Sequence, residues 1–229
     1  MFILYEIIYI IGFICYLPIL FLKGKWHEHF AMRFSLWPHW QIQALKEKKN
    51  IWVHAVSVGE VLAVQGVILG VKKLWPEYRI VISSVTKTGY QLACSKFPDD
   101  IVVYAPLDFR AVVFRYIHFI KPKIYIAAET EIWPNLFYAL SKKKIPIVLI
   151  NGRISDGSFK RYQRINLLLK EVLADVLWAG MQTQEDADRI AALGVPKDRA
   201  LVMGNMKFDG AVDVPGWARS SFGYTEDDL

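Results

Sequence analysis

The stretch Ile51-Trp-Val-His-Ala-Val-Ser-Val-Gly-Glu60 decides the fold, because in it an apolar run typical of a buried strand gives way to a helical pattern. Apolar residues recur at helical spacing directly afterwards, from Val61 to Leu69. Glu60 therefore stands where the carboxyl end of a strand meets the amino end of a helix. Open α/β sheets place their ligand sites at such junctions. The sequence thus predicts an α/β protein with a functional carboxylate at one edge of its sheet.

A second junction of the same kind follows in Lys123-Ile-Tyr-Ile-Ala-Ala-Glu-Thr-Glu-Ile-Trp-Pro-Asn135. Here Glu129 and Glu131 come after a strand of the fully buried type. One acid at a helix amino terminus is explained by the helix dipole. Two acids followed by Trp-Pro-Asn exceed that role, so we expect at least one to be functional and Asn135 to contact substrate.

Strand and helix patterns alternate along the rest of the chain. Strands are expected at residues 51–56, 79–84, 101–104, 123–128, 146–150, 176–180 and 200–203. Helices are expected near residues 60–74, 88–97, 108–120, 132–143, 157–174 and 184–193. Such alternation predicts a parallel sheet with helices on both faces.

Residues 1–22 are expected to form a membrane-anchor helix. Only Glu6, Gly12 and Pro18 in this segment are not apolar, and 22 helical residues reach about 33 Å, against a hydrocarbon core of roughly 30 Å. A secretory signal peptide would need a basic start and a small-x-small cleavage site, and the sequence has neither. Glu6 and Pro18 leave two arrangements open: a helix that spans the membrane, or one that dips into a single leaflet.

Residues 23–50 form a basic, aromatic juxtamembrane segment. Between residues 23 and 49, six Lys or Arg residues stand against two Glu, a net +4 (6 − 2) of the chain's formal +6. Positive charge beside an anchor marks the cytoplasmic side, so we expect the body of the protein to face the cytoplasm. The aromatic residues fit either an interfacial belt or an entry surface for a lipid substrate, and both readings place membrane lipid beside this segment.

Two roles are open for Glu60. Ser57-Val-Gly-Glu60 fits a capping box, in which the Glu side chain satisfies an amide at the helix end. Alternatively, a carboxylate at this junction in a dry cleft has a raised pKa and serves as a general base. Ser57 and Gly59 are further candidates for substrate binding, since Gly59 would let a substrate approach the backbone closely.

Two other turns after strands are candidates for binding an anion. Thr86 and Thr88 belong to the hydroxyl-rich turn Ser83-Ser-Val-Thr-Lys-Thr-Gly89, whose backbone amides suit a negative group; an ordinary helix cap is the alternative. Arg153, in Asn151-Gly-Arg-Ile-Ser155, is suited to a phosphate or carboxylate; a plain surface arginine is the alternative.

Several chemistries find no support in the sequence. It has no G-x-G-x-x-G and no G-x-S-x-G motif, and Cys15 and Cys94 suggest neither a disulfide framework nor a zinc site. Asp186-Ala-Asp188 sits in an amphipathic helical pattern and is interpreted as surface, and His54 as a strand residue with a satisfied ring. The basic segment lacks a nucleic-acid module. We therefore expect no metal, no cofactor and no nucleic-acid partner.

Four motifs together resemble the amino-terminal half of the Kdo transferases, which transfer 3-deoxy-D-manno-octulosonic acid (Kdo) in lipopolysaccharide synthesis. In chain order they are His54-Ala-Val-Ser-Val-Gly-Glu60, Glu129-Thr-Glu-Ile-Trp-Pro-Asn135, Asn151-Gly-Arg-Ile-Ser155 and Gly204-Asn-Met-Lys-Phe-Asp209. The resemblance covers the chain from the anchor to about Asp209.

The resemblance implies a GT-B glycosyltransferase, with two Rossmann-like domains facing each other across a cleft. Such enzymes move Kdo from CMP-Kdo onto lipid IVA, the lipid A precursor, at the inner membrane. The amino-terminal domain, here residues 51–209, binds the acceptor, and the other domain holds the CMP-sugar. By similarity Glu60 is the general base, Glu129 and Lys207 stabilise the transition state, and no metal takes part.

The resemblance also implies a second, nucleotide-sugar domain, and residues 210–229 resemble only the start of the linker to it. We therefore expect this chain to be a truncated product, a fragment or one half of a split enzyme, inactive alone. Two other readings stay open at this point. The chain can be a non-catalytic membrane-bound module that binds acidic glycolipid, or an unrelated Rossmann-like enzyme with a nucleotide cofactor.

Overall fold

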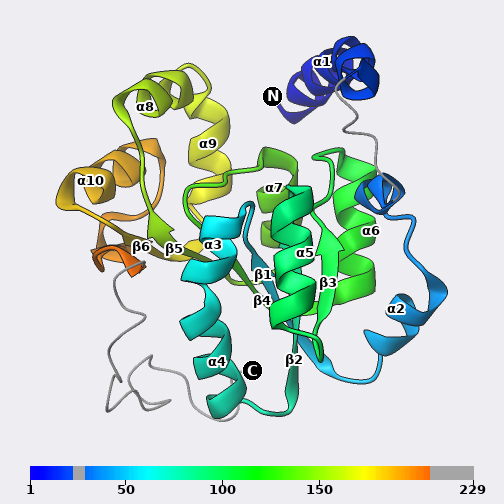
Figure 1. Cartoon of the computed structure of the whole chain (residues 1–229). Helices are drawn as coiled ribbons and strands as arrows, with labels where there is room; N and C mark the ends of the chain where they lie inside the picture. The colour runs from blue at the N-terminus through cyan, green and yellow to red at the C-terminus, as the bar shows by residue number, and fades with distance from the viewer. Residues whose placement is uncertain (23–28, 207–229) are drawn as a thin grey trace.

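The protein folds around one seven-stranded sheet in which every neighbouring pair of strands is parallel. The computed structural model describes residues 1–22 and 29–206 (Figure 1). The strands are β1 (Lys49–His54), β2 (Tyr78–Ser84), β3 (Ile101–Tyr104), β4 (Pro122–Ala128), β5 (Ile147–Gly152), β6 (Val176–Met181) and β7 (Ala200–Val202). Each overlaps one of the seven strands expected from the sequence, so the predicted α/β class with a parallel sheet is confirmed.

Helices connect the strands. They are α1 (Phe2–Leu22), α2 (His39–Ala44), α3 (Val58–Ala63), α4 (Gln65–Leu74), α5 (Lys87–Lys96), α6 (Arg110–Ile120), α7 (Pro134–Lys142), α8 (Asp156–Gln163), α9 (Asn166–Leu173) and α10 (Gln184–Leu193), with short 3-10 turns at Phe30–Phe34 and Lys197–Arg199. Two of the helices expected from the sequence are each divided in two. The first divides at Val64, and the second turns at Arg164 and Ile165.

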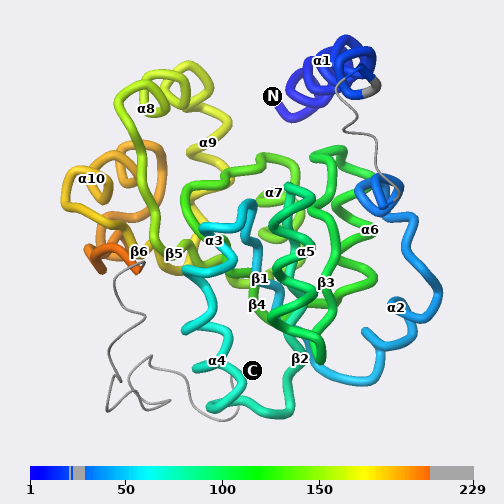
Figure 2. The backbone as a smooth tube through the Cα atoms, in the orientation of Figure 1, coloured from blue at the N-terminus to red at the C-terminus, as the bar shows by residue number. Residues whose placement is uncertain are grey.

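The strand order places a topological switch point between β1 and β4. The order is β3-β2-β1-β4-β5-β6-β7, so the chain builds outward from β1 to β3 and then returns to pair β4 with β1 (Figure 2). The loops that leave β1 and β4 at their carboxyl ends consequently run to different parts of the sheet. In open α/β sheets this divergence creates the crevice in which ligands bind.

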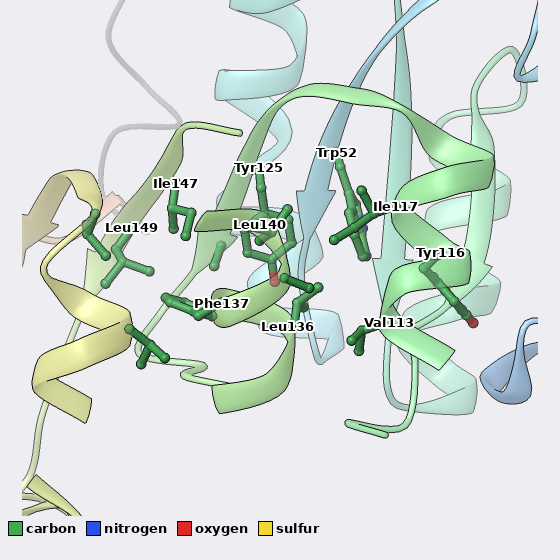
Figure 3. Close-up of a cluster of buried hydrophobic side chains, with 14 of the residues drawn as sticks. Trp52, Val113, Tyr116, Ile117, Tyr125, Leu136, Phe137, Leu140, Ile147 and Leu149 are labelled. Carbon is green, nitrogen blue, oxygen red and sulfur yellow. The ribbon is translucent and has the colours of Figure 1, made fainter. Parts of the chain in front are cut away.

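The sheet has a hydrophobic layer on each face because strands β1 to β6 are largely buried on both sides, whereas the edge strand β7 is mostly exposed. Trp52, Tyr125 and Phe137 belong to the layer under α6, α7, α9 and α10 (Figure 3). Side chains from alternate strand positions, such as Val53, pack with α3, α4 and α5 in the other layer. The Trp52 indole N–H also donates to Ser83 Oγ at 2.7 Å, so this fully buried ring leaves no polar atom without a partner.

Part of the basic, aromatic segment 23–50 belongs to the core of the domain. Phe30, Met32 and Trp37 are buried, and Met32 and Trp37 join the layer that contains Trp52. Trp40, by contrast, is 65% exposed. Aromatic content alone did not distinguish the packed rings from the exposed one.

Helix α1 is apolar and lies against the domain. Residues Phe2–Leu20 are long and apolar enough to cross a membrane, with a mean hydropathy of 2.2. Tyr5 and Glu6 nevertheless make hydrogen bonds to the loop after β3, with Tyr5 Oη donating to Asp108 at 2.8 Å and Glu6 accepting from the Arg110 amide at 3.0 Å. The helix therefore contacts the carboxyl edge of the sheet, above the amino ends of α6 and α7 (Figure 1).

Candidate active site

Three acidic side chains gather at the switch point. Glu60 comes from the turn between β1 and α3, and Glu129 and Glu131 come from the loop between β4 and α7. Because β1 and β4 are neighbours, with His54 opposite Ala127, these two loops leave the sheet side by side. The charges of Glu129 and Glu131 both act on the pKa of Glu60. The switch point therefore brings together the acids that the two junction motifs predicted.

The Glu60 carboxylate is held by the turn that carries it. Oε2 accepts a hydrogen bond from the Val56 amide at 2.7 Å, and Oε1 accepts one from the Ser57 hydroxyl at 3.0 Å. Ser57 is the N-cap residue of α3, but its side chain donates to the carboxylate and caps no amide of the helix. The reciprocal capping box is therefore absent here, although Glu60 does brace the turn.

Burial changes the acidity of Glu60. Only 6% of the residue is exposed, and this burial raises its pKa to about 7, with the charges of Glu129 and Glu131 adding to the rise. The hydrogen bonds from Val56 and Ser57 oppose it, since they favour the ionised form. A carboxylate with a pKa near neutral pH is suited to accept a proton during a reaction.

Glu129 adopts a backbone conformation that is unusual for its residue type. Its φ is +59°, in the left-handed region, while its amide donates to the Ile150 carbonyl of β5 at 2.8 Å. A non-glycine residue in this region costs about 1–2 kcal/mol, and such strain is concentrated at functional sites. The conformation turns the chain sharply out of β4 and sets the direction of the loop that carries Glu131.

The loop after β4, which carries Glu129 and Glu131, is hydrogen-bonded to the loop after β5. Thr130 Oγ1 donates to the Arg153 carbonyl at 2.8 Å and accepts from the Arg153 amide at 3.0 Å. Burial raises the pKa of Glu131, Glu129 adds to the rise, and the adjacent Trp133 indole partly opposes it. Glu60 and Glu131 thus both have raised pKa values at the switch point.

Asp108 organises this edge and was missed by the sequence analysis. Its buried carboxylate accepts hydrogen bonds from the amides of Asn135 and Leu136, at 3.0 and 2.9 Å, in the first turn of α7. Burial raises its pKa to about 7, despite these bonds and the one from Tyr5. No local pattern marks Asp108, because its partners lie more than 25 residues away in either direction along the chain.

The other candidate binding residues lie around the crevice in different settings. Asn135 is fully buried, and its side-chain amide donates to the Asp108 carbonyl at 2.6 Å. Thr86 is the N-cap of α5 and accepts from the Gly89 amide at 3.0 Å, while Thr88 is exposed in the first turn of α5. Arg153 is also exposed. Gly59 lies in the first turn of α3, and Lys207 lies outside the described residues.

Two residues differ from their interpretation in the sequence. Asp186 is buried, not on the surface: its Oδ1 accepts from the Ile154 amide at 2.7 Å, because the first turn of α10 packs under the loop after β5. His54 has only one satisfied ring nitrogen. Nδ1 lies 2.9 Å from Ser83 Oγ, whereas Nε2 is buried without a partner in the described part of the chain. Burial lowers the pKa of His54 to about 4, so the ring is neutral.

Sequence comparison identifies relatives over most of the chain. Residues 26–210 match the family model described as 3-deoxy-D-manno-octulosonic-acid transferase (kdotransferase). A bifunctional glycosyltransferase/methyltransferase of Fusobacterium nucleatum is 35% identical over 210 residues, covering 90% of this chain and 31% of the relative. A 3-deoxy-D-manno-octulosonic acid transferase of Haemophilus influenzae is 31% identical over 198 residues, covering 86% of this chain and 46% of the relative. The chain thus spans less than half the length of either protein.

Solved structures share the fold at low sequence identity. A UDP-N-acetylglucosamine 2-epimerase superposes with a TM-score of 0.54 and 14% identity, over 71% of this chain and 50% of that protein. The UDP-GlcNAc 2-epimerase of Neisseria meningitidis gives a TM-score of 0.51 and 13% identity, over 70% and 47% of the two chains. The domain therefore has a GT-B-like amino-terminal fold. At this sequence identity, the similarity shows a shared fold and not a shared function.

Proposed function

Because the chain belongs to the 3-deoxy-D-manno-octulosonic acid transferase family, we propose that its crevice binds lipid IVA and that Glu60 acts as general base when Kdo is transferred from CMP-Kdo. The observation that carries this proposal is the position of Glu60. It lies at the switch point beside Glu129 and Glu131, with a pKa raised to about 7.

In the proposed reaction, a sugar hydroxyl of the acceptor attacks the anomeric carbon of Kdo. The new carbon–oxygen bond forms as the bond from that carbon to the CMP phosphate breaks, and CMP leaves with the electron pair. The hydroxyl proton passes to Glu60, whose carboxylate is held in place by Val56 and Ser57. General-base catalysis of this kind contributes about 10²–10⁴ in rate.

Glu129 and Lys207 have proposed electrostatic roles. The anomeric carbon gains oxocarbenium character in the transition state, and the Glu129 carboxylate can offset that positive charge. Lys207 can balance the departing phosphate. Ser57, Gly59, Thr86, Thr88, Glu131, Asn135 and Arg153 remain proposed contacts to the substrates. The reaction needs neither a metal nor another cofactor in this scheme, and no group of His, Cys, Asp and Glu side chains suited to a metal occurs among residues 1–22 and 29–206.

The proposal also includes binding of the donor CMP-Kdo and attachment of the protein to the membrane. CMP-Kdo would be held by a nucleotide-sugar domain of the kind that faces the first domain in GT-B enzymes. Helix α1 would attach the protein to the cytoplasmic face of the inner membrane, since one helix of the described chain has the required length and composition. The acidic lipid and nucleotide substrates suit a chain with a formal net charge of +6.

A chimeric enzyme tests this function. The chain would be joined to the carboxyl-terminal part of the Haemophilus influenzae relative, and transfer of Kdo to lipid IVA would be followed by mass spectrometry. We expect the 229-residue chain to bind lipid IVA without transfer, and the chimera to transfer Kdo. The intact relative is the positive control.

The variant Glu60→Gln separates the roles of the residue. In the chimera it should lower kcat/KM by about 10²–10⁴ and leave lipid IVA binding within about twofold. Glu171→Gln, on the exposed side of α9, is the matched control and should leave the rate unchanged. Full activity of the Glu60 variant would mean that Glu60 only stabilises the turn between β1 and α3 and is not the general base. Failure of the chain to bind lipid IVA would overturn the proposed acceptor site.

A further inference from the structure

Helix α1 contacts the domain with one stripe, and its contacts with other elements run from Phe2 to Phe13. The stripe has helical spacing and consists of the half-buried Phe2, Tyr5, Glu6, Tyr9 and Phe13 and, at the far end, the buried Leu20. Aromatic rings carry much of the contact. Phe2 lies 4.3 Å from Tyr138 of α7 between ring centroids, and Tyr9 and Phe13 lie 5.1 and 5.4 Å from the ring of Phe109.

Three polar side chains of α1, Tyr5, Glu6 and Tyr9, are turned toward this contact. Tyr5 donates to Asp108, the Asp108 amide donates to Tyr9 Oη at 3.2 Å, and Glu6 accepts from the first amide of α6. A carboxylate at a helix amino terminus is stabilised by the helix dipole. The one charged side chain of α1 is therefore accommodated by the domain and does not need water.

The opposite stripe of α1 is apolar and exposed. Leu4, Ile7, Ile11 and Ile14 lie on it and are between 48% and 62% exposed. A spanning helix would have to carry its whole length through a hydrocarbon core of about 30 Å. Since the domain is docked on α1 between Phe2 and Phe13, spanning would draw the polar amino ends of α6 and α7 into hydrocarbon as well. A helix that lies in the membrane interface avoids this cost and still buries the exposed stripe.

A second apolar and basic feature lies at the same edge of the sheet. Helix α8 follows β5 and has no buried residue, and Tyr162 Oη donates to the Thr130 carbonyl of the crevice loop at 3.2 Å. At the corner between α8 and α9, Ile165 is 42% and Leu167 is 74% exposed. Figure 1 shows α8 and α1 above the same edge, on either side of the start of α7.

Basic side chains surround this corner. Lys160, Arg161 and Arg164 are exposed, and none of the three forms an ion pair in the described part of the chain. The acid of α8, Asp156, is already paired with Arg189. Exposed leucine and isoleucine beside unpaired positive charge match the interface of a membrane that contains anionic lipid.

We propose that this edge of the domain rests on an anionic lipid bilayer, with α1 in the plane of the interface and the corner between α8 and α9 as a second point of contact. The crevice with Glu60, Glu129 and Glu131 then opens toward the headgroups between the two contacts, where a lipid acceptor is presented. The proposal rests on the membrane attachment of the proposed function and not on its transfer chemistry.

Nitroxide depth measurements on the 229-residue chain test the orientation of α1. Single cysteines would replace Leu4, Ile7, Ile11 and Ile14, one at a time, in a background without the native cysteines, on vesicles of phosphatidylcholine and phosphatidylglycerol. We expect similar depths of about 5–10 Å at all four positions. A depth that reaches about 15 Å at Ile11 and decreases on both sides would mean that α1 spans, and would overturn the proposal. Spin–spin broadening without lipid would mean that a second copy covers the stripe, which would also overturn it.

A label at Leu167 tests the second contact. We expect it to enter the bilayer, whereas a label at Leu69, an exposed leucine of α4 distant from this edge (55% exposed), should stay in water. If both labels remain in water, the corner makes no membrane contact and the second part of the proposal is wrong. No donor or acceptor is present in these measurements, so a failure of transfer in the chimera leaves their outcome unaffected.

Charge removal tests why the corner binds. In the double variant Arg161→Ser/Arg164→Ser, the equilibrium constant for insertion of the corner into the bilayer should fall by about 30-fold, from about 1 kcal/mol for each basic residue. The control Lys73→Ser/Lys96→Ser, at the carboxyl ends of α4 and α5, removes the same charge and should have no effect. Equal effects of the two double variants would show that net charge alone acts, and would overturn a contact at this corner.

Discussion

Glu60 is expected to titrate near neutral pH, and its pKa is expected to depend on the two neighbouring acids. Burial is the main cause of its raised pKa, and the charges of Glu129 and Glu131 add to the rise. Replacing either neighbour with Gln removes one negative charge from the crevice. The pKa of Glu60 should therefore fall in both variants, without returning to its usual value because burial remains.

The size of the effect follows from a pKa of about 7 against the usual 4.5. At pH 6 only about one-tenth of Glu60 would be ionised, and at pH 8 about nine-tenths, whereas an ordinary Glu is almost fully ionised at both. Stability changes in the opposite direction to the ionisation of Glu60. The folded state keeps the proton up to about pH 7 and the unfolded state loses it near 4.5, so this residue lowers the free energy of unfolding as the pH rises through that window.

The titration can be measured directly by ¹³C NMR of the Glu side-chain carboxyl carbons in the labelled chain. Glu60→Gln identifies the resonance by its loss. It should also remove the fall in stability between about pH 4.5 and 7. The Gln side chain can keep the contact to the Val56 amide, and the Ser57 hydroxyl can accept where it now donates.

A control and a clear refutation are available. Glu171→Gln removes an exposed acid from α9 and should leave the Glu60 titration unchanged. If Glu60 titrates near 4.5, or if neither neighbouring variant moves its pKa, the three acids do not share a crevice. The argument for Glu60 as a base near neutral pH would then be wrong.

Three further changes have expected outcomes. Glu129→Gly should raise the free energy of unfolding by about 1 kcal/mol, by removing left-handed strain, while lowering the rate of the chimera in the transfer assay. Gly89→Ala should destabilise the domain by about 1–3 kcal/mol in denaturant unfolding, since its Cβ would lie 2.5 Å from a serine hydroxyl and 3.2 Å from the backbone of the turn after β1. Tyr5→Phe should raise the pKa of Asp108, because it removes a hydrogen bond to the ionised carboxylate, and Glu6→Gln should lower it, because it removes a nearby negative charge. An NMR titration of Asp108 measures both shifts, and shifts of equal sign would contradict the docking of α1.

The sheet could be predicted because its signals are local. Strands that are buried on both faces read as continuous apolar runs, and the first six runs here are each followed by a helical pattern. The positions of Glu60 and Glu129 at strand ends followed from the same reading. That the two acids meet depends on the pairing of β1 with β4, which is a contact between segments more than 60 residues apart.

The features that were missed are those made by distant contacts. Asp108 has no motif around it, and its role appears only when α1 and α7 are both in place. The burial of Asp186 likewise depends on the loop after β5, which lies 32 residues earlier in the chain. Two expected helices are divided at Val64 and Ile165, and no Gly or Pro stands directly beside either residue. Periodicity alone could not place these breaks.

The position of Asp108 connects the apolar helix to the crevice. One carboxylate accepts hydrogen bonds from Tyr5 of α1 and from the first two free amides of α7, whose start directly follows the loop of Glu129 and Glu131. An unpaired buried carboxylate is costly, so the three bonds are formed most favourably together. Displacing α1 from the domain would leave Asp108 with fewer donors and weaken the cap on α7. The same contact that would hold the domain at the membrane therefore also stabilises the loop that carries two of the three acids.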